Sequence, residues 1–244
     1  MCTLLIGIDR PRAGHLLLGA NRDESQARPA VSPHVLVREP LIVAGRDSVA
    51  GGTWLGIQSG RLVAALLNRN APKGATEGAW ATGGEPDRSR GLLCLDALRM
   101  DSAAQVVEWV KDEVLTCRYA PFTLFVADAR GVFAAYWDGR MRVEELFPGW
   151  HVLTHGDVDD PFDPRSELAH TNLRLAPPRT AEDLVPTLGS HEGDRAVCLH
   201  DVPHGTVSSS LVHVDWNSGV TRYLHAAGQP CTTPYQDVSR LLGS

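Results

Sequence analysis

The order of strand-like and helix-like runs constrains the fold of this chain most. Short apolar runs between Gly and Pro turns fill residues 2–67 and predict strands, and the period then becomes helical over residues 90–100 and 103–114. Strand groups separated from helix groups are typical of α+β proteins, in which helices pack on antiparallel sheets. The expected strands are 2–8, 15–21, 41–44, 54–58, 62–67, 122–128, 131–138, 142–154, 196–200, 208–215 and 220–226, with weaker helices over 164–175 and 181–188.

Length and composition indicate one globular unit. A chain of 244 residues that is 43% hydrophobic and 21% charged has enough apolar material for a large core, and we expect a single domain over residues 1–244. The Pro- and Gly-rich residues 71–86 are the best candidate for a mobile loop, and the alternative that we favour is a plain long connection on the surface.

Charge and hydropathy exclude several partners. The formal net charge is −6 and the arginines are scattered, so nucleic acid and anionic membranes are not expected partners. No apolar run approaches the roughly 20 residues needed to span a bilayer, and no secretory leader is recognisable. We therefore expect no integral membrane segment and a cytoplasmic location. The oligomeric state stays open.

The cysteines predict neither disulfides nor a metal centre. There are five of them, they lie far apart, and no C-x-x-C pair occurs. We therefore expect reduced thiols and no bound metal.

Cys2 is the candidate nucleophile. Removal of Met1 would leave Cys2 with both a thiol and a free α-amine. An α-amino group titrates at about 7.7–8.0, so near neutral pH it can accept the thiol proton. The alternative is that Cys2 is a small hydrophobic residue at the start of an apolar strand.

The segment ANRDE, residues 20–24, supports the catalytic alternative. Side chains alternate along a strand, so Asn21 and Asp23 share one face while Arg22 and Glu24 share the other. We expect Asp23 and Asn21 to lie beside Cys2, where they could hold its amine and donate to an oxyanion, and Arg22 and Glu24 to pair on the solvated face.

Several motifs together resemble one family. They occur in order along the chain: Cys2, ANRDE (20–24), Arg28-Pro29, GGTWLGI (51–57), LLNRN (66–70), SRG (89–91) and HGTVSSSLVHVD (204–215). This set resembles the NRDE family, also called the transport and Golgi organisation 2 family. That family is distantly similar to the N-terminal-nucleophile hydrolases that include bile-salt hydrolases and penicillin V acylases.

The resemblance implies a four-layer αββα sandwich and a set of site residues. Cys2 would attack an amide carbonyl, Asp23 would orient the amine, and Asn21 would neighbour it. Asn68 in LLNRN and His155 after the WHVLT run would contact the oxyanion or the substrate.

Three positions depart from the pattern of those hydrolases. Ala20 stands where they have an arginine, His155 where they have the second oxyanion asparagine, and Val207 where an arginine commonly precedes the late serine pair. Each lost donor would remove about 2–4 kcal/mol of transition-state stabilisation unless another group replaces it. Arg22 would replace the first only from a twisted or bulged strand.

Arg22, Trp54 and His151 are the candidate substrate contacts. Trp54 follows a glycine pair and would form either an apolar wall of a ligand site or part of the core. His151 and His155 fall on one face of a strand end, where they would contact a ligand, haem included, or pack in a cleft.

Two functions remain open. The first is a cysteine amidohydrolase or acyltransferase that takes a small acylated molecule and needs no cofactor. The second is a binding or trafficking protein on the same scaffold, with haem or a lipid or acyl-CoA as ligand, because members of the family have been linked to haem movement and lipid homeostasis.

Overall fold

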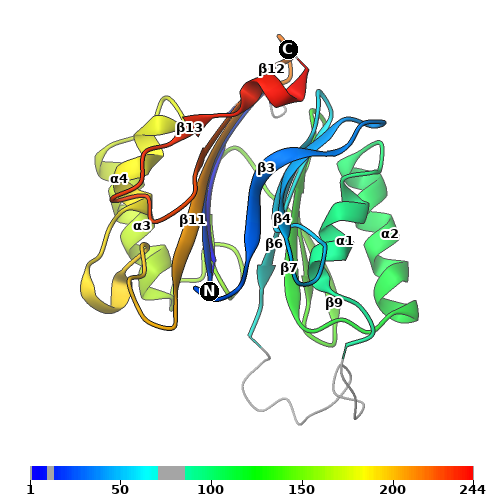
Figure 1. Ribbon diagram of the computed structural model, residues 1–244, viewed down its shortest axis with the longest axis horizontal. Coiled ribbons are helices and arrows are strands. Elements are labelled where there is room, and N and C mark those ends of the chain that lie inside the picture. Colours follow the sequence, from blue (N-terminus) through cyan, green and yellow to red (C-terminus); the bar gives the residue numbers. More distant parts are fainter. Residues whose placement is uncertain (1, 10–13, 71–85, 244) are drawn as a thin grey trace.

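Two antiparallel sheets lie face to face, with helices on both outer faces (Figure 1). The computed structural model describes residues 2–9, 14–70 and 86–243. The first sheet has the order β10 (Gly149–Leu153), β1 (Thr3–Ile8), β2 (His15–Ser25), β11 (His204–Asp215), β12 (Val220–Ala226), β13 (Gln236–Asp237). The second has the order β3 (Ala30–Val37), β4 (Ile42–Asp47), β5 (Leu55–Gln58), β6 (Leu62–Asn68), β7 (Phe122–Ala127), β8 (Val132–Trp137), β9 (Met141–Glu145).

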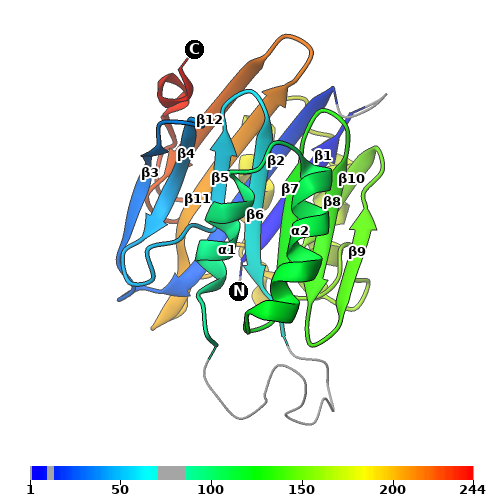
Figure 2. The same cartoon turned by 90° about the vertical axis from the view of Figure 1, so that its right-hand side faces the viewer.

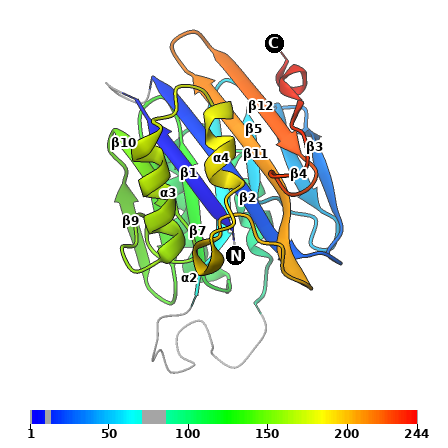
Figure 3. The same ribbon diagram turned by 90° about the vertical axis from the view of Figure 1, so that its left-hand side faces the viewer.

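The helices form the two outer layers. Helices α1 (Arg90–Ala97) and α2 (Ala103–Thr116) cover the seven-stranded sheet (Figure 2). Helices α3 (Pro164–Leu175) and α4 (Val185–Leu188) cover the six-stranded sheet (Figure 3), and short 3-10 turns occupy Glu182–Leu184, Gly193–Arg195 and Ser239–Leu242. The expected α+β, four-layer αββα sandwich is thereby confirmed.

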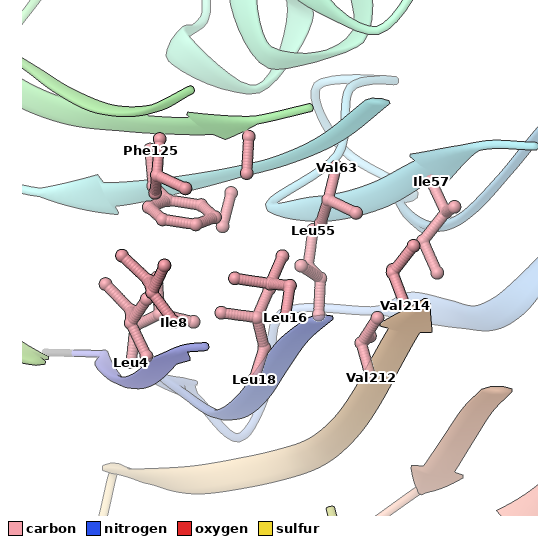
Figure 4. Packing of buried hydrophobic residues seen from close by; sticks show 14 of the residues in the cluster. Leu4, Ile8, Leu16, Leu18, Leu55, Ile57, Val63, Phe125, Val212 and Val214 are labelled. Atoms are coloured by element: carbon pink, nitrogen blue, oxygen red, sulfur yellow. The ribbon is translucent and has the colours of Figure 1, made fainter. Parts of the chain in front are cut away.

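Alternating side chains explain the layering. In β1, Leu4, Ile6 and Ile8 point into the cluster between the sheets, whereas Leu5 points to the layer under α3 and α4. Figure 4 shows the inner cluster, in which Leu4 and Leu18 of one sheet face Phe125 and Val63 of the other. Strands buried on both faces read as continuous apolar runs, which is why they were recognisable in the sequence.

Most expected elements are present, two expectations were wrong, and the edge strands β3 and β13 were not expected. Residues 142–154 form two strands in different sheets, β9 and β10, because the chain leaves the second sheet around Phe147 and Pro148. Residues 196–200 form no strand and instead run as an irregular segment over β2. Strand β3 was missed because it is a sheet edge, carries Pro33 and has few buried positions.

Some expectations concern residues outside the described ranges. These are Met1, whose removal the nucleophile hypothesis requires, and residues 71–85 of the long connection. Within residues 2–9, 14–70 and 86–243, no helix combines the length and apolar character needed to cross a bilayer. The cytoplasmic location stays a prediction.

Candidate active site

Cys2 lies at the edge of the inter-sheet core, immediately before β1. It packs partly against the inner cluster, and its Sγ is 3.9 Å from the backbone oxygen of Asp23 on the neighbouring strand β2. The thiol lines a pocket of about 130 Å³. The other residues around this pocket are Arg22, Asp23, Glu24, Arg28, Asp47, Thr53, Trp54, Leu66, Asn68, Ser89, Arg90 and Gly91.

The Cys2 thiol is neutral at physiological pH. Burial raises its pKa, and the nearby Asp23 carboxylate raises it further, while Arg22 acts in the opposite direction. A thiol in such surroundings is a weak nucleophile until a base takes its proton. Chemistry at Cys2 therefore requires a base close to the sulfur.

Asp23 is fixed on the outer face of β2. Its Oδ1 accepts a hydrogen bond of 2.7 Å from Thr206 Oγ1, and its Oδ2 lies 4.0 Å from Arg165 Nη1 of α3. Burial raises the pKa of this carboxyl to about 6, against the lowering effects of Thr206 and Arg165. At neutral pH Asp23 is therefore mostly ionised and presents a negative charge near Cys2.

Asn21 shares the face of Asp23, as the strand alternation predicted, but its side chain bonds neighbouring segments of the fold instead of facing Cys2. Its Nδ2 donates to the carbonyls of Leu188 at 2.8 Å and Val197 at 3.0 Å, and its Oδ1 accepts from Ser209. Both amide hydrogens are used in this way, and Asn21 does not line the Cys2 pocket. The structure thus corrects the expectation of an oxyanion donor: Asn21 anchors the layer above β2.

His155 is placed at the corresponding end of the neighbouring strand. Cys2 and His155 each lie two residues beyond the paired residues Leu4 and Leu153 of β1 and β10. Arg165 Nη2 donates to His155 Nδ1 at 2.8 Å, and burial together with Arg165 lowers the pKa of the imidazole. His155 is therefore neutral with its proton on Nε2, which leaves Nε2–H as a donor.

Arg22 lies on the inner face of β2 and corrects the expectation of a solvated ion pair. It is 5% exposed, its guanidinium stacks 4.4 Å from the centre of the Trp54 ring, and its Nη2 is 3.3 Å from Asp47 Oδ2. Burial lowers its pKa. Ala20, which stands where the hydrolases have an arginine, points to the same inner face. Arg22 therefore places a guanidinium on that face two residues further along the strand.

A bulge lies opposite this part of β2. Thr206 pairs with Asp23 and Ser208 pairs with Arg22, so Val207 is the extra residue of β11. The irregularity falls on the partner strand rather than on β2, opposite Arg22 and Asp23.

The glycine-rich motif and the start of α1 form one wall of the pocket. The Thr53 amide donates to Gly91 O at 2.9 Å, and a Cβ on Gly52 would lie 2.1 Å from the Gly91 carbonyl carbon. Glycine is therefore required at position 52 for this close approach. Ser89 caps α1, and Arg90 donates to the Pro121 carbonyl. Because Thr53 is bonded to Gly91, the SRG and GGTW segments meet, and both line the pocket.

The remaining predicted residues divide into two groups. Asn68 ends β6 and Trp54 precedes β5, and both line the Cys2 pocket. His151 does not: its Nδ1 bonds Asp159 at 2.7 Å and its Nε2 bonds the Phe147 carbonyl at 2.8 Å. Burial would lower the pKa of His151, but these bonds outweigh it and raise the pKa. His151 is thus used in fixing the turn after β10.

Sequence reasoning missed Arg165, Thr206 and Arg90. Arg165 is buried at the start of α3, where Asp163 caps the helix through the Arg165 amide. The sequence predicted a weak helix over residues 164–175 but not the direction of the Arg165 side chain. Thr206 and Arg90 belong to motifs that had been recognised, without a role for these two positions.

The architecture is that of N-terminal-nucleophile hydrolases. An N-acylethanolamine-hydrolyzing acid amidase ortholog of Caenorhabditis elegans matches with a TM-score of 0.63 at 16% identity, covering 90% of this chain and 94% of that one. A variant of the conjugated bile acid hydrolase of Clostridium perfringens matches with a TM-score of 0.50 at 12% identity, covering 98% and 93%. At such identities the likeness concerns the fold.

The sequence itself gives the family. The family profile "Transport and Golgi organisation 2" matches residues 1–183, and the chain belongs to that family. A homolog from Mus musculus is 26% identical over 264 residues, covering 91% of each chain. The Bos taurus homolog is 31% identical over 183 residues, covering 66% of this chain and 59% of its own. The resemblance inferred from the motifs is confirmed.

Proposed function

We propose that this protein is a cysteine amidohydrolase or acyltransferase that forms a thioester between Cys2 and the acyl group of a small amide. The observation that carries the proposal is the position of Cys2: its thiol opens onto a polar pocket that the buried Asp23 also lines, and its Sγ lies 3.9 Å from the Asp23 backbone oxygen on the adjoining strand. The names of both structural neighbours describe hydrolases, and one is an amidase, which agrees with this chemistry.

The proposed reaction needs a base at Cys2, because the thiol pKa is raised. Removal of Met1 would free the α-amine of Cys2, which takes the thiol proton as sulfur bonds to the amide carbon. The C–N bond then breaks, and the leaving amine takes that proton. Water hydrolyses the thioester to the acid and restores the thiol, whereas another nucleophile would complete an acyl transfer.

Three side chains would support these steps. Ionised Asp23 would hold the α-ammonium that forms during attack, in line with its fixed position between Thr206 and Arg165. Asn68, which lines the pocket, would donate to the oxyanion, and so would the Nε2–H of His155, which is not part of the pocket lining but lies at the position beyond β10 that corresponds to Cys2 beyond β1. The arginines that line the pocket, Arg22 among them, would contact the polar part of the substrate, and Trp54 would form an apolar wall.

The test is the mass of the intact protein before and after incubation with a panel of N-acyl amides. We expect the purified chain to lack Met1 and to gain one acyl group, which peptide mapping places on Cys2. Cys2→Ala should abolish the adduct, and Cys117→Ser, the matched control at a half-buried thiol elsewhere, should keep it. Retention of Met1, or equal labelling of the Cys2→Ala variant, would refute the mechanism.

Binding of haem or an acyl lipid without turnover is the second candidate, and a different pocket favours it. A hollow of about 500 Å³ lies where β1, β2 and β10 meet, with Leu17 and Trp150 as apolar walls and His15 and His213 among its lining. Such a volume suits a cofactor-sized ligand. Burial and the neighbouring His15 lower the pKa of His213, which keeps its imidazole neutral and able to ligate iron.

A Soret titration tests this second candidate. Haem binding at the hollow should shift the Soret band in the original chain and in Cys2→Ala and His155→Ala, and the shift should be lost in His213→Ala. Absence of any shift would dispose of the haem alternative, and loss in Cys2→Ala or His155→Ala would move the haem to the Cys2 pocket.

A further inference from the structure

Four metal-ligating side chains meet in the irregular layer above β2 and in the loop after β12. They are His191, Cys198, His200 and Cys231, and one donor atom from each lies within 4.8 Å of all the others. The two Sγ atoms are 3.7 Å apart, and His200 Nε2 is 3.7 Å from Cys198 Sγ and 3.3 Å from Cys231 Sγ. The rings of His191 and His200 approach with centroids 5.0 Å apart.

The distances among Cys198, His200 and Cys231 match a tetrahedral metal centre, and the donor atom of His191, within 4.8 Å of the others, would approach further on binding. Zinc bonds of about 2.3 Å to sulfur and about 2.0–2.1 Å to nitrogen place tetrahedral ligands at about 3.8 Å for S···S and about 3.6 Å for S···N. We propose that His191, Cys198, His200 and Cys231 form a structural Zn²⁺ site. Two thiolates and two imidazoles favour zinc over the oxygen-seeking ions Mg²⁺ and Ca²⁺, and two thiolates balance the charge of Zn²⁺.

The backbone holds the four residues in place independently of a metal. The carbonyl of Ser190 accepts from the amides of Val197 at 3.1 Å and Cys198 at 2.9 Å, which closes the loop that carries His191. The amides of Thr232 and Thr233 donate to Gln229 O and form the turn that presents Cys231. A preformed arrangement of this kind lowers the entropy that binding would cost.

The site would act on structure rather than on substrate. Four protein ligands complete a tetrahedral zinc centre and leave no open position, as in structural zinc sites. Its ligand segment connects directly to the candidate active site, because Thr206 Oγ1 accepts from the Leu199 amide at 2.9 Å and donates to Asp23. Zinc would therefore fasten the irregular segment that positions the Asp23 carboxylate.

The experiment measures metal content and cobalt spectra of the whole protein, purified under reducing conditions. We expect about one zinc per chain, and Co²⁺ in its place should give thiolate charge-transfer and tetrahedral d–d bands. Cys231→Ser and His191→Ala alter exposed side chains. Each should weaken zinc binding by more than the roughly 10–100-fold that loss of an outer partner of a ligand costs.

Matched controls separate ligation from general effects. Cys117→Ser and His34→Ala alter a thiol and an imidazole outside the cluster and should keep the metal and the cobalt bands. Far-UV circular dichroism confirms that each variant is folded. The proposal is overturned if the reduced protein binds no zinc at stoichiometric concentration, or if Cys231→Ser binds it as tightly as the original chain. A Cys198–Cys231 disulfide that, once reduced, gives no zinc affinity would also overturn it.

Discussion

The two faces of β2 use one five-residue motif for different tasks. On the outer face, Asn21 and Asp23 are tied to other elements and segments by short hydrogen bonds and are almost fully buried. On the inner face, Arg22, which is equally buried, and Glu24 line the polar pocket, which Asp23 also borders from near the end of the strand. The outer face therefore holds the fold together, whereas the inner face offers charge to whatever enters the pocket.

The two faces differ in whether the partner of a substituted residue would keep other hydrogen bonds. The carbonyls that Asn21 serves have no water to replace a lost donor, because they are enclosed between β2 and its covering layer. The carboxylate of Asp47, the partner of Arg22, also accepts a hydrogen bond of 2.6 Å from Arg28 Nε and bonds from the backbone amides of Val49 and Ala50. Loss of an outer-face residue should therefore destabilise the fold more than loss of an inner-face residue.

Asn21→Ala should have the largest effect. It removes both donors to the Leu188 and Val197 carbonyls, and an unsatisfied buried acceptor costs about 1–3 kcal/mol, so we expect a loss of about 2–5 kcal/mol in the free energy of unfolding. Urea unfolding measures it. Asn68→Ala, at an exposed asparagine, is the matched control and should change stability by less than about 0.5 kcal/mol. Equal losses in the two variants would break the comparison.

Asp23→Asn should change how stability depends on pH. Because burial raises the folded-state pKa to about 6 from 3.8, the carboxyl stabilises the fold fully below about pH 4, and that contribution is lost as the pH rises through 6. The term is on the order of 3 kcal/mol at 1.36 kcal/mol per unit.

Unfolding free energies of the original chain and of Asp23→Asn, measured from pH 3.5 to 7.5, isolate this term by their difference. The original chain should lose stability relative to the variant between about pH 4 and 6.5. A difference that does not vary with pH would mean that Asp23 titrates normally and is not held in a buried network.

Residues on regular strands were the ones the sequence could place. The alternation along ANRDE correctly assigned Asn21 and Asp23 to one face and Arg22 to the other, because the pleat alone decides it. Which face is buried was not decided by alternation. Arg22 was expected in solvent and is buried because the second sheet, through Trp54 and Asp47, closes over it.

The positions of residues on irregular segments could not be predicted from sequence periodicity. Cys198 and Cys231 are 33 residues apart and meet through loops whose paths depend on Ser190 and Gln229 backbone bonds. No period or short spacing encodes that meeting, so the expectation of no metal rested on the number and wide spacing of the five cysteines and on the missing C-x-x-C pair. The same holds for Arg165, whose approach to Asp23 depends on how α3 packs on the sheet.

Arg22→Met should have a moderate effect on stability. It removes the contact with the Trp54 ring and one ion pair of Asp47 but keeps the apolar stem in place. Since Asp47 retains Arg28, we expect a loss of about 1–2 kcal/mol. Urea unfolding of Arg22→Met and Asn21→Ala under the same conditions compares the loss in unfolding free energy from the inner face with that from the outer face. A loss as large as that of Asn21→Ala would show that the inner face is equally structural.

Glu24→Gln should have the smallest effect on stability. Glu24 Oε2 lies 3.8 Å from Arg28 Nε, the carboxylate side chain is 26% exposed, and Arg28 keeps its closer partner Asp47. Partly exposed ion pairs of this kind contribute about 0.2–1 kcal/mol, so we expect a change of less than about 0.5 kcal/mol in urea unfolding. The amide oxygen of the variant side chain can still accept from the Ser25 amide, as Glu24 Oε1 does at 2.8 Å. A loss above about 1 kcal/mol would mean that the Glu24 carboxylate stabilises the sheet. The contrast between the two faces of β2 would then not extend to residue 24.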